Sequence, residues 1–227
     1  MELAGATWRQ VEATGGTAVL AVPLGSLEQH GPHLPLDTDT RIAAALVHAL
    51  EAHRPDVAAA PALPYGASGE HADFPGTVLV GHDVLSGVLV ELVRSARAWF
   101  RGVVLVSGHG GNAEALDAAA QRCAEDGDDV LVWQAAPAGG DAHAGRTETS
   151  LMLAIEPAAV HLELAEPGCT EPLGTVLPRL RAEGVRPVSS NGVLGDPTGA
   201  SADEGRALLD ALVRDLVAAV ARRWPAP

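Results

Sequence analysis

Acidic and imidazole side chains are concentrated in one short stretch of the chain, LGSLEQHGPHLPLDTD, residues 24–39. Glu28 and His30 follow a run of apolar residues that is typical of a buried strand. If the backbone stays extended, its two-residue period directs Glu28 and His30 to one side and Gln29 to the other. The first pair of candidate ligands is therefore Glu28 with His30.

A second acidic pair, Asp37 and Asp39, repeats this spacing a few residues later. The glycine and prolines of residues 31–35 favour a turn, which can fold the second pair back toward the first. We expect His33, within the turn, to be a solvated loop residue rather than a substrate contact.

Two later loops carry the same residue types. His109 lies in SGHGGN, between an apolar run and a helical segment, and His143 and Glu148 lie in DAHAGRTETS. Loops that follow the strands of an open α/β sheet meet at one edge, so these side chains are expected to converge with the first cluster.

Carboxylates mixed with imidazoles are a ligand set for Zn, Mn or Fe(II). Calcium and magnesium sites are usually all oxygen, and structural zinc normally brings thiolates. The two cysteines, Cys123 and Cys169, are not in these loops. The pattern predicts a catalytic site for two divalent metal ions that share one aspartate, polarise a carbonyl and generate hydroxide at neutral pH.

The segment GASGEHADFPGT, residues 66–77, brings Ser68, Glu70 and His71 close together. A Ser-His-acid triad would need a nucleophile elbow of the Gly-x-Ser-x-Gly type, which the segment lacks. We therefore expect these three residues to form a substrate-facing loop beside the metals, with a plain surface turn as the alternative.

Composition excludes several classes of function. The 227 residues include 15 basic and 29 acidic side chains, giving a formal charge of -14, which disfavours nucleic acid and anionic membranes as partners. All of the basic residues are arginine, so lysine-dependent chemistry is excluded. The two cysteines cannot form a disulfide framework, and the first residues do not resemble a signal peptide, which together predict a cytoplasmic location.

Apolar runs of strand length alternate with longer segments of helical period. The fold class is thus α/β, a single domain over residues 1–227 with a mostly parallel central sheet flanked by helices. We expect residues 165–200 to be irregular and Ser201 with Glu204 to form a capping box. The expected strands are 17–25, 56–66, 102–106 and 129–136, and the expected helices are 40–54, 83–100, 113–126, 147–157 and 201–224.

In the same order along the chain, LGSLEQHGPHLPLDTD, SGEHADFPGT, SGHGGN and HAGRTETSLMLA resemble the motifs of the creatininase family of metal-dependent amidohydrolases. The resemblance implies a creatininase-like sandwich in which Asp39 bridges two metal ions. His143 matches the histidine that handles protons near the scissile amide, and Glu148 matches an acidic position after it. The metal ligands carried over are Glu28, His30, Asp39 and His109, while Asp37 is left in a supporting role.

The chain departs from the creatinine-opening members at two places. Those enzymes carry Tyr and Glu where this chain has Gly110 and Gly111, and that Glu is a metal ligand. They also use two tryptophans around the small ring, whereas the corresponding segment here holds only Trp133. These changes disfavour creatinine as the substrate and open the pocket, leaving Gly110, Gly111 and Trp133 as substrate contacts and Glu148 as the acid that completes the second metal site.

Within the family, the short length and the SSNGVLGDPTGASADEG tail resemble a branch that cuts a short C-terminal fragment from a modified precursor peptide. A short modified peptide is the substrate that this resemblance implies. Two alternatives remain open at this point: a hydrolase acting on a small cyclic amide or formamide, and a non-catalytic metal-stabilised protein that binds a peptide. Family members tend to form cyclic assemblies, often hexamers, so the resemblance also implies a homo-oligomer.

Overall fold

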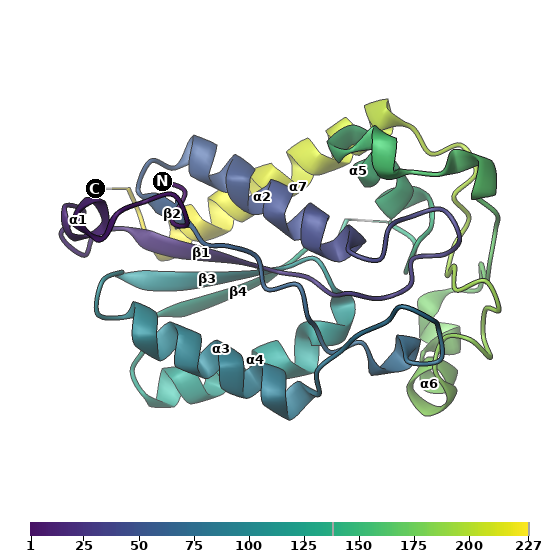
Figure 1. Ribbon diagram of the computed structural model, residues 1–227, viewed down its shortest axis with the longest axis horizontal. Coiled ribbons are helices and arrows are strands. Elements are labelled where there is room, and N and C mark those ends of the chain that lie inside the picture. The colour runs from purple at the N-terminus through teal and green to yellow at the C-terminus, as the bar shows by residue number, and fades with distance from the viewer. Residues whose placement is uncertain (138, 227) are drawn as a thin grey trace.

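A four-stranded parallel sheet forms the centre of the computed structural model, which describes residues 1–137 and 139–226 (Figure 1). The strand order is β2-β1-β3-β4. In the register, Val19 pairs with Val57 and Gly102, and Val103 pairs with Val130. The strands are β1 (Val19–Leu24), β2 (Val57–Ala59), β3 (Gly102–Ser107) and β4 (Val130–Gln134).

Helices cover both faces of the sheet, three on one side and two on the other (Figure 1). The first face is covered by α2 (Thr38–His53), α5 (Arg146–Ile155) and α7 (Ala202–Arg223), and the second by α3 (His82–Ala96) and α4 (Ala113–Glu125). The short α1 (Trp8–Glu12) lies near one end of the sheet, and α6 (Leu173–Glu183) lies beyond the other. None of the helices in the described ranges is both long and apolar enough to cross a membrane.

Strands β1, β2 and β3 are buried on both faces, whereas the edge strand β4 is mostly half-buried, and alternate side chains of the strands enter two separate cores. In β1, Val19 and Ala21 pack against α2, α5 and α7, while Leu20 and Val22 pack against α3 and α4. The continuous apolar runs of the sequence follow from this two-sided burial. The predicted α/β class with a parallel sheet is confirmed.

Three elements differ from the prediction. The strand predicted at 56–66 ends at Ala59. The amides of Ala60 and Leu63 still donate to the backbone oxygens of Ala21 and Pro23, but the chain does not continue as a strand beyond Ala59. Residues 165–200 contain α6, which the sequence hides because Pro178 lies inside the helix and prolines and glycines flank it. Ser201 caps α7 by accepting a bond from the Glu204 amide, but the Glu204 carboxylate binds Arg146 instead of completing the capping box.

Candidate metal centre

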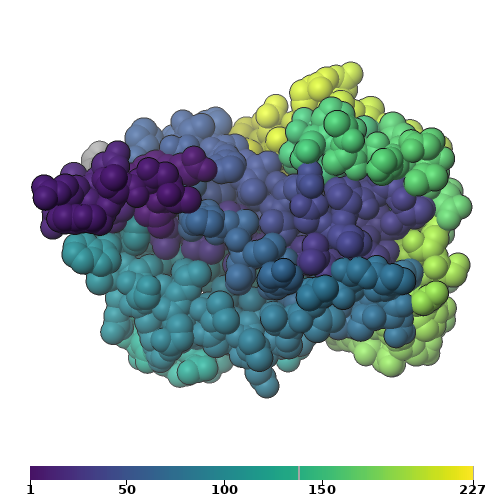
Figure 2. All heavy atoms as spheres, viewed as in Figure 1, coloured from purple at the N-terminus to yellow at the C-terminus, as the bar shows by residue number. Residues whose placement is uncertain are grey.

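The predicted ligands meet at the carboxyl edge of the sheet. The loop after β1 carries Glu28 and His30, and the first turn of α2 carries Asp39, which lies directly over the strand ends. Gly25 and Gly108 make this approach possible, since a side chain at either position would collide with the backbone of Thr40 or Asp39. Figure 2 shows the segment around residues 30–40 packed at this end against the green and yellow-green segments from residue 150 onward.

Asp39 lies between two histidines and turns one carboxylate oxygen toward each. Its Oδ1 is 3.1 Å from Nε2 of His30, and its Oδ2 is 3.0 Å from Nδ1 of His109. Ser26 donates a hydrogen bond of 2.7 Å to Oδ2 and fixes the carboxylate plane. This arrangement suits a carboxylate that bridges two cations.

Glu28 is fully buried, and neither of its carboxylate oxygens has a hydrogen-bond partner. Oε1 is 3.3 Å from Nε2 of His71, and Oε2 is 3.2 Å from Nε2 of His109. A buried carboxylate without hydrogen bonds is costly unless a cation neutralises it. Glu28 therefore needs a positive charge at this place.

His143 reaches the cluster from the loop before α5, where an isolated bridge pairs it with Leu194. Its Nε2 lies 2.8 Å from the backbone oxygen of Gln29, so Nε2 carries the hydrogen that it donates there. Its Nδ1 lies 3.7 Å from Oε1 of Glu28. The unprotonated Nδ1 is consequently the atom that faces the cluster.

Glu148 comes from the first turn of α5 and approaches from the opposite side. Its Oε2 accepts a 2.6 Å hydrogen bond from the amide of Ala144 and lies 3.8 Å from Nε2 of His30. Ala144 has a φ of 51°, in the left-handed region that non-glycine residues rarely adopt. Strained backbone of this kind is often found at functional sites, and here it turns an amide toward Glu148.

The electrostatics of the cluster call for added positive charge. Burial opposes ionisation of His30 and His109, but nearby carboxylates outweigh it and raise the pKa of each ring to about 10. Burial raises the pKa of Glu28 and of Glu148 to about 7. A bound metal ion would displace these protons, so its affinity is expected to rise with pH.

Asp39 and His143 are shifted in the other direction. Burial opposes ionisation of Asp39, but His30 and His109 outweigh it and hold the pKa of its carboxyl well below its usual range. Burial, together with His30 and His71, lowers the pKa of His143 well below its usual value. His143 is therefore neutral at physiological pH, as a proton acceptor must be.

Three expectations about nearby residues are wrong. His33 is buried rather than solvated, and its Nε2 donates to Thr149 Oγ1 at 2.8 Å. Trp133 is not a substrate contact, because its indole lies in the core beneath α7 and donates to Asp215. Gln29 does not face away from the site, because its side-chain amide lies against His71 and His143.

Asp37 contributes nothing to the cluster. It lies at the N-cap of α2, where it forms a surface ion pair with Arg41.

The loop that carries Ser68, Glu70 and His71 lies beside His109. Ser68 Oγ and Glu70 Oε1 are 3.4 and 3.7 Å from His109 Nε2. His71 is buried against Glu28, and Gly111 is packed against the same ring of His109. Ser68, Glu70, His71 and Gly111 thus lie next to the predicted ligands His109 and Glu28. Gly110 lines the adjoining cavity.

Sequence analysis missed three supporting residues. Gln29 Nε2 lies 2.8 Å from His71 Nδ1 and 3.0 Å from His143 Nε2. Asn112 ties two loops together by accepting from the Ala67 amide and donating to the Gly25 oxygen. Ser26, as described above, holds Asp39. Their positions next to Glu28 and His109 in the motifs were the available signal, since a residue beside a ligand often orients another one.

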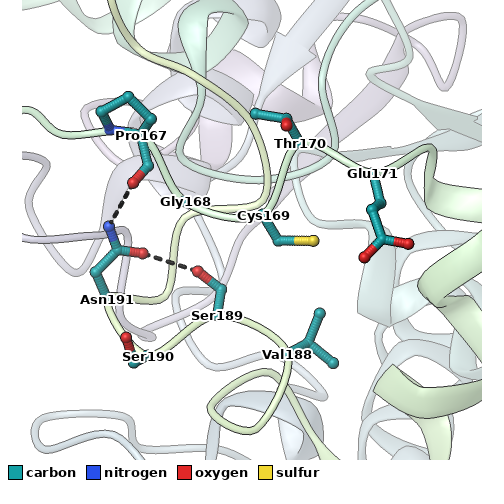
Figure 3. A pocket seen from close by; sticks show the side chains of 9 residues that line it. All are labelled: Pro167, Gly168, Cys169, Thr170, Glu171, Val188, Ser189, Ser190 and Asn191. Carbon is teal, nitrogen blue, oxygen red and sulfur yellow. Dashed lines mark hydrogen bonds between the residues drawn. The ribbon is translucent and has the colours of Figure 1, made fainter.

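A cavity of about 780 Å³ borders the cluster at Gly110 and Glu148. A smaller cavity of about 460 Å³ lies between residues 167–171 and 188–191 (Figure 3). In its wall Asn191 bonds both Ser189 and the Pro167 oxygen, which fixes the two loops together. Residues 169–171 line both cavities, so the smaller one adjoins the larger rather than the ligands themselves.

The donor set fits divalent metal ions. Three groups of side chains place one ligand atom each within 4.8 Å of one another, and Asp39 contacts the histidines of two of them, His30 and His109. The orphaned oxygens of Glu28 supply the independent indication of a missing cation. The groups are Glu28, Asp39 and His109; His30, His143 and Glu148; and Glu28, His71 and His143.

Comparison with known proteins shows that residues 4–220 match the creatininase family, described as creatinine amidohydrolase. The chain belongs to the creatininase family. The mycofactocin precursor peptide peptidase of Mycobacterium tuberculosis is 48% identical over the whole chain and 93% of its own length. The creatinine amidohydrolase of Pseudomonas putida is 30% identical over 96% of this chain and 95% of its own.

A solved creatininase structure superposes with a TM-score of 0.80 at 27% identity, covering 99% of this chain and 98% of that one. Other creatininase structures are described as a manganese form and as a mutant of Zn-Zn type. Together with the clusters above, they indicate that this chain too binds divalent metal. As a creatininase-family hydrolase, it is an enzyme that acts on amide bonds.

Proposed function

We propose that this chain is a dinuclear metal-dependent peptidase that releases a short C-terminal fragment from the mycofactocin precursor peptide. The observation that carries the proposal is Asp39, held between His30 and His109 in a chain that is 48% identical to peptidases of that name. The creatinine amidohydrolase is a more distant relative at 30% identity, which makes a small cyclic amide the weaker candidate.

In this proposal Asp39 bridges the two ions. Glu28 and His109 hold the first ion, and His30 and Glu148 hold the second. The ions are Zn, Mn or Fe(II), and when bound they polarise the scissile carbonyl and lower the pKa of water. His30 is prepared for this role because its Nδ1 faces the Glu28 backbone oxygen at 3.2 Å, which leaves Nε2 free for the metal.

His143 is proposed as the residue that moves the proton. The Gln29 oxygen fixes its Nε2–H, and Nδ1 faces the reacting centre. A neutral Nδ1 can accept a proton from the water that attacks the amide. It can then donate this proton to the departing amine. His71, which receives a hydrogen bond from Gln29 and faces Glu28, is proposed to orient that ligand rather than to react.

The substrate is proposed to approach through the cavity of about 780 Å³ that opens at Gly110 and Glu148. The absence of a side chain at Gly110 leaves this wall open. A peptide segment fits a cleft of this size, which lies within the range of about 300 to 1,000 Å³ that is usual for ligand sites.

The proposal is tested by incubating the metal-loaded protein with the modified precursor peptide and identifying the products by mass spectrometry. Cleavage near the C-terminus is expected. His143→Ala should keep its metal and slow cleavage by about a hundredfold to ten-thousandfold. His161→Ala, at an exposed histidine, serves as the control. Failure of the wild-type protein to cut the peptide, or unchanged cleavage by His143→Ala, would contradict the respective assignment.

We also propose that the protein forms a homo-oligomer. Exposed apolar side chains gather on and before α3, at Val78, Val84 and Val88, which supports burial of this surface against another copy. Light scattering that detects only a monomer would contradict this proposal.

A further inference from the structure

Glu70 has an unusual environment for a carboxylate near the surface. It lies in a single helical turn, Gly69–His71, and the amide of Val185 fixes its backbone oxygen at 2.8 Å. Within the described residues, the one ion-pair partner within 4 Å of its carboxylate is His109, at 3.7 Å, and no arginine approaches it. Its side chain is 30% exposed, which leaves the carboxylate room to adjust.

Gly111 makes room for this carboxylate. A Cβ at position 111 would lie 2.5 Å from Glu70 Oε1 and 2.6 Å from the Ala67 oxygen, and closer still to the ring of His109. The backbone at Gly111 does not require a left-handed conformation, so packing and not torsion selects glycine here. The chain thus lacks a side chain at the point where the Glu70 carboxylate meets His109.

Two carboxylates converge on His109 Nε2, Glu28 at 3.2 Å and Glu70 at 3.7 Å. Neighbouring ligands around a divalent ion lie about 3 to 3.5 Å apart, because each bond is about 2.0 to 2.3 Å long. The Glu28 separation is that of ligands sharing one ion, whereas the Glu70 separation is slightly longer, so the partly exposed Glu70 side chain would have to move toward the ion to bind it. The buried Glu28, whose oxygens have no hydrogen-bond partner, is the independent sign that a cation belongs on this side of His109.

We propose that Glu70 is a further carboxylate ligand of the ion on the His109 side, reaching it through the space that Gly111 leaves free. This inference rests on the metal centre of the proposed function and extends it from a substrate-facing to a ligating role for Glu70. Sequence analysis assigned Glu148 to the ion held by His30, and Glu148 does lie near His30. Each ion would then have its own peripheral carboxylate, Glu70 for one and Glu148 for the other.

Three variants test the proposal by binding of Mn²⁺, which requires no peptide. Glu70→Gln should weaken one of the two ions by about tenfold or more and leave the other unchanged. Glu70→Asp keeps the charge but shortens the reach, so it should lose most of the same affinity. Glu114→Gln, on the exposed first turn of α4, removes a nearby charge and should bind as the wild type does.

The decisive measurements are calorimetric titration with Mn²⁺ and the visible spectrum after loading with Co²⁺, with circular dichroism to confirm folding. A changed Co²⁺ spectrum in Glu70→Gln supports direct ligation. Wild-type Mn²⁺ affinity in Glu70→Gln would overturn the proposal. So would wild-type affinity in Glu70→Asp, because charge alone would then explain the effect. A protein that binds two ions normally but cuts no peptide would contradict the proposed function and leave this inference intact.

Discussion

Buried carboxylates have different partners at the two ends of the sheet. At the amino edge, Asp56 forms two bonds of 2.8 Å with the guanidinium of Arg54, and Arg101 also contacts it. At the carboxyl edge, Glu28 and Asp39 are even more deeply buried, yet their ion-pair partners within the described residues are histidines, with Ser26 donating to Asp39.

This difference separates a structural charge from a functional one. Permanent cations neutralise the carboxylates at the amino edge, and the Arg54 side chain lowers the pKa of Asp56 by hydrogen bonding. At the carboxyl edge the available cations are imidazoles, which lose their proton when a metal ion binds. The chain has 15 arginines, but none of them is among the described contacts of Glu28. The negative charge of Glu28 is therefore left to be neutralised by a bound cation.

The largest effect is expected from removing the charge that both ions share. Asp39→Asn should lose both ions and reduce hydrolysis by at least about a thousandfold, because polarisation of the carbonyl and activation of water both depend on them. Elemental analysis measures the loss. Asp37→Asn, two residues earlier but paired with Arg41 at the surface, is the matched control and should keep both ions. Retention of both metals by Asp39→Asn would refute the bridge.

Removing a peripheral carboxylate should have a one-sided effect. Glu148→Gln should lower the affinity of one ion by about tenfold or more and nearly abolish hydrolysis, with little change in the thermal stability of the metal-free protein. Glu156→Gln, at the other end of α5, is the control. If metal content and turnover stay at wild-type values, Glu148 serves only to accept the Ala144 amide and favour the helix N-terminus.

The amino edge should respond in stability instead. Arg54→Met leaves Asp56 and the Trp224 oxygen without their buried partner and should lower the free energy of unfolding by about 3 kcal/mol. Metal content should not change. Arg206→Met removes an exposed pair and should cost less than about 1 kcal/mol. Urea unfolding provides the comparison, and loss of metal in Arg54→Met would show that the two edges are not independent.

A smaller effect is expected from His33, which burial keeps neutral by lowering its pKa to about 4. Unfolded histidine titrates near pH 6.5, so as the pH falls below that value the unfolded state takes up this proton first and the native state loses stability. Between pH 6.5 and 5 this loss should be about 2 kcal/mol in the metal-free protein. His33→Gln should lose less stability over that range than the wild type, whereas His161→Gln should behave as the wild type does. Parallel pH curves for all three would exclude His33 as the source.

Sequence analysis predicted most of the sheet and the meeting of the four motif residues proposed as ligands, because both depend on local pattern. Continuous apolar runs reflect strands buried on both faces, and loops after parallel strands must meet at one edge. Glu28, His30, Asp39 and His109 therefore converge as expected. These features require no knowledge of how distant segments pack.

The errors arose where tertiary contacts decide. His33 is buried because Thr149, far along the chain, accepts its hydrogen bond, and no local signal distinguishes that from a solvated loop. Gln29 enters the site because His71 and His143, both distant in sequence, lie against its side-chain amide, and the local two-residue period cannot reveal this. Helix α6 forms despite Pro178 because Val176 and Leu180 pack into a small separate cluster.

The candidate ligands come from four segments that are distant in sequence: the loop after β1, the start of α2, the loop after β3 and the start of α5. An ion that binds them together acts as a cross-link, since it holds long intervening loops closed and removes conformations from the unfolded chain. Chelation should therefore loosen the carboxyl edge first, with faster hydrogen exchange in the loops of the ligands, while the arginine-paired amino edge stays protected. The metal centre would then stabilise the fold as well as carry out the reaction.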